Sequence, residues 1–403
     1  MKHDNIDGIG DWIVRSGLEG IEESELLRRF CERCIAAGLP VGRAIAIADT
    51  LHPVYEGRVF RWRNDGPETP SVDYGRTNEG ELAESWRRSP FFHLLETGKE
   101  EMRRRIGLRE EPGFDALVEM QREGVTDYVA FVHRFARSSA IGEMDCVYSS
   151  WATVDKAGFS DDNVAALRRL VPALALAIKS GALARIAGTL VEVYLGRDAG
   201  KRVLDGSIQR GVADRIEAVL WFSDLRGYTS ITDSAPPGEV IPLLNDYADA
   251  VISAIHEAGG DVLKLIGDGT LAIFKADNPG EACRRALKAE ASLRARAREL
   301  NARRAAEGRP VTTVYLGLHI GEVFYGNIGS EHRLDFTVVG PAVNEVNRIA
   351  SMCRSVDRTM VTSADFAAST PEPERSRPVS VGRYALRGVG RAQELFTLDP
   401  ALL

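Results

Sequence analysis

Residues 262–274 contain two apolar, strand-like runs separated by a Gly-Asp-Gly sequence centred on Asp268. Glycine and aspartate between two such runs are typical of a tight β-hairpin. The hairpin follows a strand-like run at 216–222 and a helix-like segment at 237–258, and a second helix and a further strand come after it. This βαββαβ order predicts a ferredoxin-like α+β domain, in which the first strand lies beside the third.

Two aspartates in this predicted domain are candidate metal ligands. Asp224 follows the first strand, and Asp268 lies at the hairpin tip, 44 positions later. Because the end of the first strand meets the tip of the hairpin, we expect the two carboxylates to converge. Two converging carboxylates bind hard cations such as Mg²⁺, which suits a nucleoside triphosphate substrate. Either aspartate taken alone is more simply interpreted as a turn or cap residue.

A second group of polar residues has the chemistry to bind a nucleotide. Lys264 interrupts an apolar strand, and strict alternation places it on one face with Val262 and Ile266. The alternative interpretation is a lysine that protects the edge of a sheet. Residues 335–340 are strand-like, and Pro341 then marks the first turn of a helix.

In that helix, Asn344 and Arg348 are four residues apart and therefore share a face away from the apolar stripe. An arginine can form two parallel bonds to phosphate oxygens, and an asparagine both donates and accepts. Arg387 is a further cation at the end of a predicted strand. For each of these residues, a solvated surface position is the alternative.

The first 178 residues alternate between helix-like and strand-like segments and predict a separate α/β module. A helix-like segment over 161–178 closes it, with Ser160 as its N-cap. The pattern of residues 147–178 resembles a GAF-type regulatory domain, which implies an unknown small-molecule or other signal. Haem binding by His52, His93 or His133 is possible in principle, but hydrogen-bonded or solvated histidines are the commoner case. Strands are expected at 43–48, 58–62, 127–135 and 144–154.

Residues 179–214 form the predicted connector between the two modules. Residues 180–195 carry an apolar stripe at helical spacing, and Gly196 and Gly200 then interrupt it. A stripe of this kind fits a helix that pairs with a second copy of the chain, or one that packs on its own domain. The sequence leaves both alternatives open.

Composition excludes some classes of protein. The chain has 403 residues, with 51 Lys and Arg against 58 Asp and Glu, so its net charge of −7 argues against a general nucleic-acid binder. Five cysteines are too few and too scattered for a disulfide framework and indicate a reducing compartment. Cys31 and Cys34 form a CxxC that we interpret as packing rather than a zinc site.

We find no signal peptide, and the apolar stretch 170–178 is too short to span a membrane, so we expect a cytoplasmic protein.

Five motifs in the last part of the chain resemble the catalytic domain of class III nucleotidyl cyclases. They are WFSDLRGYTSIT, GGDVLKLIGDGTLAIF, GLHIGEVFYGNIGS, RLDFTVVGPAVNEVNRIAS and YALRGVG. The resemblance implies three parts: a GAF-like regulatory domain at 1–178, a helical transducer at 179–214 and a catalytic domain at 215–403.

The resemblance also implies roles for single residues. Asp224 and Asp268, with the carbonyl of Leu225, correspond to the ligands of two Mg²⁺ or Mn²⁺ ions per active site. Lys264 corresponds to the lysine that recognises adenine, where guanylyl cyclases typically have Glu. Thr337 occupies the other base-reading position, as in a bacterial adenylyl cyclase subgroup that includes bicarbonate-responsive members.

The remaining correspondences concern the phosphates. Asn344 and Arg348 correspond to the pair that stabilises the transition state. Arg387 stands where the family usually has a phosphate-binding lysine, and Arg333 is a further candidate for a phosphate contact.

In this family, one subunit supplies the metal aspartates and its partner supplies the base-reading and transition-state residues. The resemblance therefore implies a homodimer that converts ATP to 3′,5′-cyclic AMP and pyrophosphate. A guanylate cyclase and a nucleotide-binding signalling module without turnover are the alternatives. The sequence Gly259-Gly260-Asp261-Val262 resembles the GGDEF motif of diguanylate cyclases only faintly, because the Glu-Phe is absent.

Overall fold

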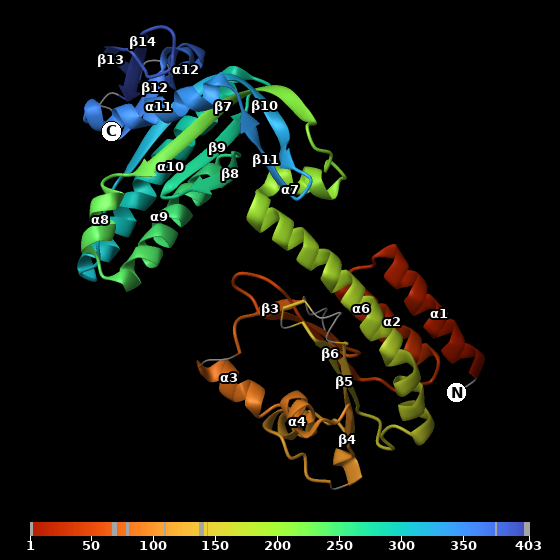
Figure 1. Ribbon diagram of the computed structural model, residues 1–403. Coiled ribbons are helices and arrows are strands. Elements are labelled where there is room, and N and C mark those ends of the chain that lie inside the picture. The colour runs from red at the N-terminus through yellow and green to blue at the C-terminus, as the bar shows by residue number, and fades with distance from the viewer. Residues whose placement is uncertain are drawn as a thin grey trace. The chain divides into compact units, whose positions relative to one another are not determined.

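The protein was analysed as a computed structural model that describes residues 3–66, 71–77, 80–108, 110–136, 141–142, 144–374 and 377–398. It divides into two compact units, Met1–Leu190 and Val191–Leu403 (Figure 1). The division lies within the segment that the sequence predicts as the connector.

In unit 1, the described residues form a six-stranded antiparallel sheet with the order β3-β2-β1-β6-β5-β4. The four strands predicted from the sequence are confirmed. Side chains of the central strand β6 are buried along its whole length, because helices cover both faces of the sheet. The strands are β1 (Arg43–Asp49), β2 (Gly57–Arg63), β3 (Val72–Tyr74), β4 (Glu101–Arg104), β5 (Asp127–Arg134) and β6 (Cys146–Thr153).

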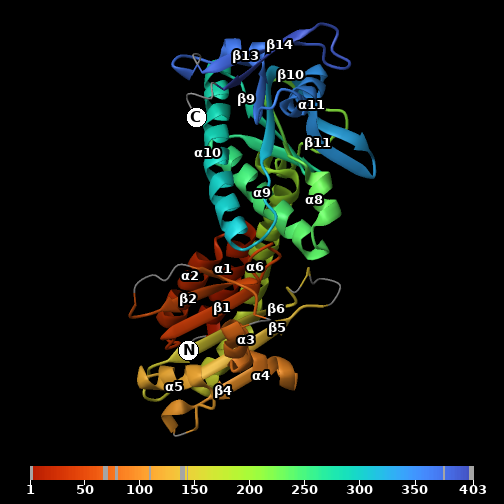
Figure 2. The same cartoon turned by 90° about the vertical axis from the view of Figure 1, so that its left-hand side faces the viewer.

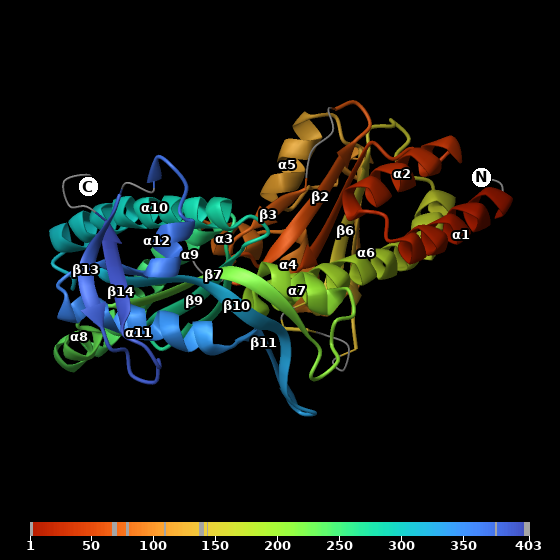
Figure 3. The same ribbon diagram turned by 90° about the horizontal axis from the view of Figure 1, so that it is seen from above.

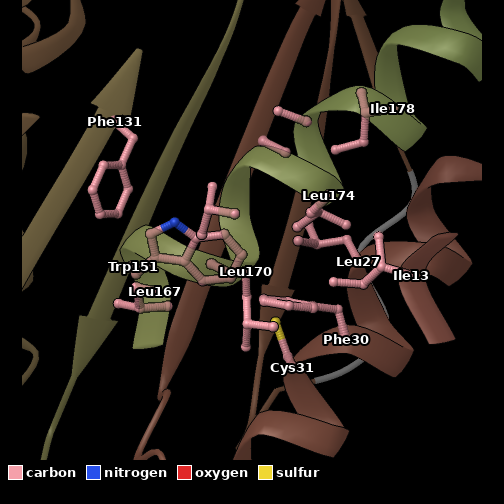
Figure 4. Packing of buried hydrophobic residues seen from close by; sticks show 14 of the residues in the cluster. Ile13, Leu27, Phe30, Cys31, Phe131, Trp151, Leu167, Leu170, Leu174 and Ile178 are labelled. Atoms are coloured by element: carbon pink, nitrogen blue, oxygen red, sulfur yellow. The ribbon is translucent and has the colours of Figure 1, made fainter. Parts of the chain in front are cut away.

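Two hydrophobic cores lie on opposite faces of this sheet. One is formed with α1 (His3–Glu19), α2 (Glu23–Ala36) and the long helix α6 (Asp161–Leu195). Figure 4 shows Trp151 of the sheet among Phe30 and Cys31 of α2 and Leu170 of α6. Cys31 and Cys34 are fully buried in this core, which confirms their interpretation as packing residues. The second core is formed with α3 (Gly80–Arg87), α4 (Pro90–Thr97), the short 3₁₀ helix Ile106–Leu108 and α5 (Asp115–Arg122).

Helix α6 is longer than expected, since one continuous helix of 35 residues replaces the two separate segments predicted from the sequence. Ser160 caps its start, as predicted, by accepting a hydrogen bond from the backbone of Asn163. By length and hydropathy alone, α6 could cross a membrane, although 44% of its most apolar window is buried within the protein. The expectation that the chain has no membrane span remains a prediction.

The described residues of unit 2 form an eight-stranded sheet with the order β13-β14-β12-β10-β7-β9-β8, and β11 pairs with β10. The part β10-β7-β9-β8 places the first strand of the βαββαβ unit between the fourth and the third, which confirms the ferredoxin-like core. The strands are β7 (Ala213–Leu225), β8 (Asp261–Ile266), β9 (Gly269–Lys275), β10 (Val314–Ser330), β11 (Arg333–Val339), β12 (Met360–Ser363), β13 (Pro378–Tyr384) and β14 (Gln393–Leu398).

Helices cover both faces of this sheet as well. Helices α9 (Pro237–Glu257) and α10 (Pro279–Ala306) lie side by side on one face (Figure 2). Helices α7 (Arg197–Leu204) and α11 (Pro341–Ser355) pack on the other face, over alternate residues of the same strands. The short helices α8 (Tyr228–Ser234) and α12 (Ala364–Ser369) follow β7 and β12. Figure 3 shows the β10–β11 hairpin extending from this layer.

Candidate functional site

Asp224 and Asp268, which we call the acid pair, lie together at one end of the sheet of unit 2. Asp224 is the penultimate residue of β7, and Asp268 lies in the two-residue turn between β8 and β9, which pairs with β7. Gly267 gives this turn a φ of +63°, a conformation that favours glycine and that a type II′ hairpin requires at this position. The backbone N–H of Leu225 lies 3.1 Å from Asp224 Oδ1 and 3.3 Å from Asp268 Oδ2, so both carboxylates face the same amide.

The electrostatics of the acid pair fit a divalent cation. Partial burial and the nearby Asp268 carboxylate raise the pKa of Asp224 to about 6. Two carboxylates that share a site cannot both ionise at low cost unless a positive charge separates them. Carboxylate oxygens are among the ligands that Mg²⁺ prefers, and the group of Leu225 that contacts the pair is its backbone N–H. The described residues contain no group of three or more His, Cys, Asp or Glu side chains that could hold a metal ion, and the acid pair itself brings two carboxylates together.

The acid pair lines a cleft of about 970 Å³ in unit 2. The turn that follows Asp224, a tyrosine of β10 and one face of α11 also line the cleft. Its polar lining includes Arg226, Tyr228, Tyr315, Asn347, Ser351 and Arg354.

Asn344 and Arg348 lie on a different part of α11 from the residues that line this cleft. Both side chains are exposed, and no described residue forms a hydrogen bond or ion pair with either. The helix itself is fixed closely against the sheet, because a Cβ on Gly317 of β10 would lie 2.6 Å from the backbone nitrogen of Ala350. The pair is therefore presented on a rigid helix but outside the cleft of its own chain.

Lys264 is on the opposite strand face from the one predicted. A β-bulge between Val262 and Lys264 breaks the alternation of β8, so Lys264 pairs with Leu271 and Val262 pairs with Ala272. Leu271 and Ala272 belong to the cores on opposite faces of the sheet. The sequence-based placement of Lys264 beside Val262 is therefore wrong, because strict alternation does not allow for the extra residue.

On its actual face, Lys264 reaches the β10–β11 hairpin. Its Nζ lies 2.6 Å from Asp335 Oδ2, and both side chains are partly exposed. Thr337 is two residues further along β11 and thus on the same strand face as Asp335. The Thr337 hydroxyl is buried and has no hydrogen-bond partner among the described residues. The structure therefore brings a flexible cation and an unpartnered hydroxyl to one region of unit 2.

The two remaining residues that were predicted to contact phosphate lie on the surface. Arg387 is exposed in the connection between β13 and β14, and Arg333 is the exposed first residue of β11. Neither lines the cleft that contains the acid pair.

Sequence reasoning missed the arginines that do line the cleft. No role is predicted from the sequence for Arg226 or for Arg354. A usable signal existed on α11, where Asn347, Ser351 and Arg354 follow one another at helical spacing and form a polar stripe beside the apolar one.

Comparison with known proteins finds relatives of the domain that contains this site. Residues 212–399 match the family described as the adenylate and guanylate cyclase catalytic domain. This part of the chain is therefore similar to a cyclase catalytic domain, and its sheet and helices are the mixed α+β arrangement that the sequence predicts.

The chain is similar to an adenylate cyclase of Anabaena cylindrica, at 32% identity over 168 residues, which are 42% of this chain and 34% of that protein. It is also similar to two solved structures. The adenylyl cyclase CyaB from P. aeruginosa matches at 21% identity and a TM-score of 0.43, covering 47% of this chain and 96% of that one. The guanylyl cyclase Cya2 matches at 29% and 0.41, covering 46% and 93%. The chain spans about a third of the length of the curated relatives it matches.

Proposed function

We propose that the chain is an adenylate cyclase, which converts ATP to 3′,5′-cyclic AMP and pyrophosphate at the interface of a homodimer. The convergence of Asp224 and Asp268 on the amide of Leu225 is the observation that carries this proposal. In the reaction, the ribose 3′-oxygen forms a bond to the α-phosphorus, the bond from that phosphorus to the pyrophosphate oxygen breaks, and the hydroxyl proton passes to solvent.

The acid pair and the carbonyl of Leu225 would hold two Mg²⁺ or Mn²⁺ ions in each active site. When bound, such ions supply charge stabilisation at the attacking and leaving oxygens. The protein contributes the position of these ligands, which the tight turn at Gly267 and the β7–β9 pairing fix. In addition, Arg348 stabilises the charge that develops on the α-phosphoryl oxygens, and Asn344 orients the ribose.

The location of the remaining site residues supports a shared active site. Lys264, Thr337, Asn344 and Arg348 do not line the cleft that holds the acid pair of the same chain. A second chain can bring its own copy of these residues to that cleft, and a homodimer then has two equivalent sites. Leu265 and Ile266, which are 55% and 48% exposed beside the hairpin tip, provide apolar surface for such a contact.

The chemistry at Lys264 and Thr337 favours adenine. A lysine donates to the ring nitrogens of adenine, and the unpartnered Thr337 hydroxyl can bond to the exocyclic amine. The ion pair between Lys264 and Asp335 is partly exposed, so it costs little to release the lysine to a ligand. Arg387 of the same half supplies a positive charge to the phosphates.

We also propose that unit 1 is the GAF-like sensor and that its signal changes how the two catalytic domains face each other. Its six-stranded antiparallel sheet with helices on both faces supports this assignment. A comparison of the full chain with residues 191–403 tests it, because α7 packs in the catalytic core and belongs to the shorter chain. Equal rates at matched dimer content would leave unit 1 without a regulatory role.

The deciding experiment is an assay of the purified chain with ATP and with GTP, each in the presence of Mg²⁺ and then Mn²⁺. We expect cyclic AMP from ATP and much slower turnover of GTP. Faster turnover of GTP would replace the proposal with a guanylate cyclase. Nucleotide binding without any cyclic product under all four conditions would replace it with a signalling module.

A further inference from the structure

We infer that Arg226 and Arg354 form a binding site for the diphosphate end of the nucleotide and for the pyrophosphate that leaves. This inference rests on the proposed function and extends it, because it assigns the diphosphate contacts to the chain that supplies the acid pair. Three features of the cleft support it: the position of Arg226, the position of Arg354 and the lack of a counter-charge on either guanidinium.

Arg226 is held at the cleft by its backbone and by an aromatic ring. Its backbone is fixed on both sides: its N–H donates to the carbonyl of Thr313 at 2.9 Å, and its carbonyl accepts from the hydroxyl of Thr312 at 2.6 Å. Its guanidinium carbon lies 5.9 Å from the centre of the Tyr315 ring. Because Tyr315 is directly opposite Asp224 in the pairing of β10 with β7, this contact holds the guanidinium on the acid-pair side of the cleft.

Arg354 reaches the same cleft from another element. It lies in the last turn of α11, on the polar stripe with Asn347 and Ser351. The cleft is therefore bordered by one guanidinium from the turn after β7 and by a second one from α11. Arg348, six residues earlier on α11, does not line this cleft.

Neither of these two arginines has a carboxylate partner among the described residues. No described residue forms an ion pair or a hydrogen bond with the guanidinium of Arg226 or of Arg354, although Asp233 and Asp357 also line the cleft. Elsewhere in unit 2, several arginines that lie against the protein have carboxylate partners, as Arg304 has with Asp246, whereas Arg285 donates to backbone carbonyls. Two guanidinium groups beside a divalent-cation site match an anion that carries several phosphate oxygens, since each group can form two parallel bonds to such oxygens.

A binding measurement with inorganic pyrophosphate and Mg²⁺ tests the inference without turnover. On the full chain, we expect Arg226→Ala and Arg354→Ala each to weaken pyrophosphate binding by roughly 10- to 100-fold, the range for loss of a hydrogen bond to a charged group. Arg226→Lys keeps the charge but not the planar contact with Tyr315. Its pyrophosphate affinity should therefore lie between that of Arg226→Ala and that of the unchanged chain. Arg298→Ala is the matched control, since Arg298 is an exposed arginine of α10 that does not line the cleft.

Changes of less than twofold in both alanine variants, with folding verified by circular dichroism, would overturn the inference. A wild-type chain that makes no cyclic nucleotide would instead contradict the proposed function, and the pyrophosphate measurement would still decide whether the two arginines bind diphosphate.

Mixing experiments test which half of the shared site contains the two arginines. A chain with both Arg226→Ala and Arg354→Ala should regain activity when mixed with Arg348→Ala chains, because one site of the mixed dimer then has two intact halves. It should regain none with Asp268→Ala chains, because both defects lie in the same half. Recovery with the Asp268→Ala chain would show that the arginines act from the opposite half, and the inference would be wrong.

Discussion

The buried carboxylates of unit 1 differ from the acid pair of unit 2 in their partners, although unit 2 also holds one buried carboxylate, Glu290, that pairs with Arg294. In unit 1, each of three buried carboxylates has a partner: Asp127 pairs with Arg103 at 2.8 Å, Glu23 pairs with Arg185 at 2.7 Å, and Asp49 accepts from a tyrosine hydroxyl. In unit 2, the half-buried Asp224 lies against a second carboxylate instead of a cation.

This difference fits a structural role for the paired carboxylates of unit 1 and the proposed metal-binding role for the acid pair. A buried carboxylate with a cationic partner stabilises one arrangement of the chain and has little capacity to bind anything else. Two adjacent carboxylates, one of them with a raised pKa, are unfavourable in the protein alone, and such sites are where ligands or catalysis are found. The side chains of the exposed pair on α11 and of the two cleft arginines likewise have no hydrogen-bond or ion-pair partner among the described residues.

The largest expected effect is at the acid pair. Asp224→Ala should lower cyclase activity by roughly 10³-fold or more, because one of two side-chain metal ligands is lost. The measurement is cyclic AMP formation with Mg²⁺ and with Mn²⁺, with dimer content checked by light scattering. Retained turnover in an intact dimer would contradict the metal assignment.

The next effect is a recovery of activity. Asp268→Ala and Arg348→Ala chains should each be nearly inactive, whereas an equal mixture should reach about a quarter of wild-type activity. Half of the dimers are then mixed, and each mixed dimer has one intact site of two. The measurement is activity after the chains are mixed and the mixed dimer is demonstrated. A proven mixed dimer without activity would contradict the shared site.

In unit 1, a change to a paired charge should affect stability. Arg103→Ala leaves Asp127 buried without its partner and should lower the free energy of unfolding of unit 1 by about 3–5 kcal/mol. Arg105→Ala is the control, because Arg105 pairs only with the exposed Asp161 and should contribute less than about 1 kcal/mol. Scanning calorimetry measures both. Equal effects of the two variants would remove the contrast between the units.

A smaller effect concerns base preference. Lys264→Glu should lower kcat/KM for ATP by roughly 10- to 100-fold relative to GTP, because a charged donor to the base is replaced by an acceptor. Asp335→Asn removes only the surface partner of Lys264 and should change the ratio by less than a few-fold. The measurement is initial rates with both nucleotides, and an unchanged ratio for Lys264→Glu would exclude Lys264 from base recognition.

The smallest effect is a dependence of stability on pH. Burial lowers the pKa of His319 below its usual 6.5, although Glu345 and Asp365 raise it in part. The neutral imidazole, hydrogen-bonded to Ser363 at 2.8 Å, therefore adds stability above pH 6.5 that is lost as the pH falls towards the lowered pKa. We expect the melting temperature of unit 2 to fall between pH 7 and 5, and His319→Gln to weaken this dependence. An identical pH profile for the variant would exclude His319 as its source.

Much of the catalytic fold follows from local sequence signals. The Gly-Asp-Gly turn and the order of apolar runs predicted the strands of the core and the convergence of the acid pair, because a two-residue turn and βαββαβ topology leave few alternatives. The helix with Asn344 and Arg348 was predicted for the same reason: Pro341 marks its start, and an apolar stripe marks its buried face.

The features that were missed depend on contacts distant in sequence. Alternation alone cannot show the bulge in β8, because it becomes visible only in the register with β9. The continuity of α6 through Gly181 and Gly188 depends on the tertiary packing of its buried side chains. Arg226 resembles any turn residue until the pairing of β10 with β7 places Tyr315 beneath it.

The extra residue in β8 has a consequence for how this protein could diverge. Leu263 fills the apolar layer beside the bulge, so the adjacent lysine does not have to contribute to that layer. Substitutions at position 264 therefore do not disturb the packing of the core. Under the proposed role of Lys264 in base recognition, single codon changes there would alter the preference between purines while the fold stays intact.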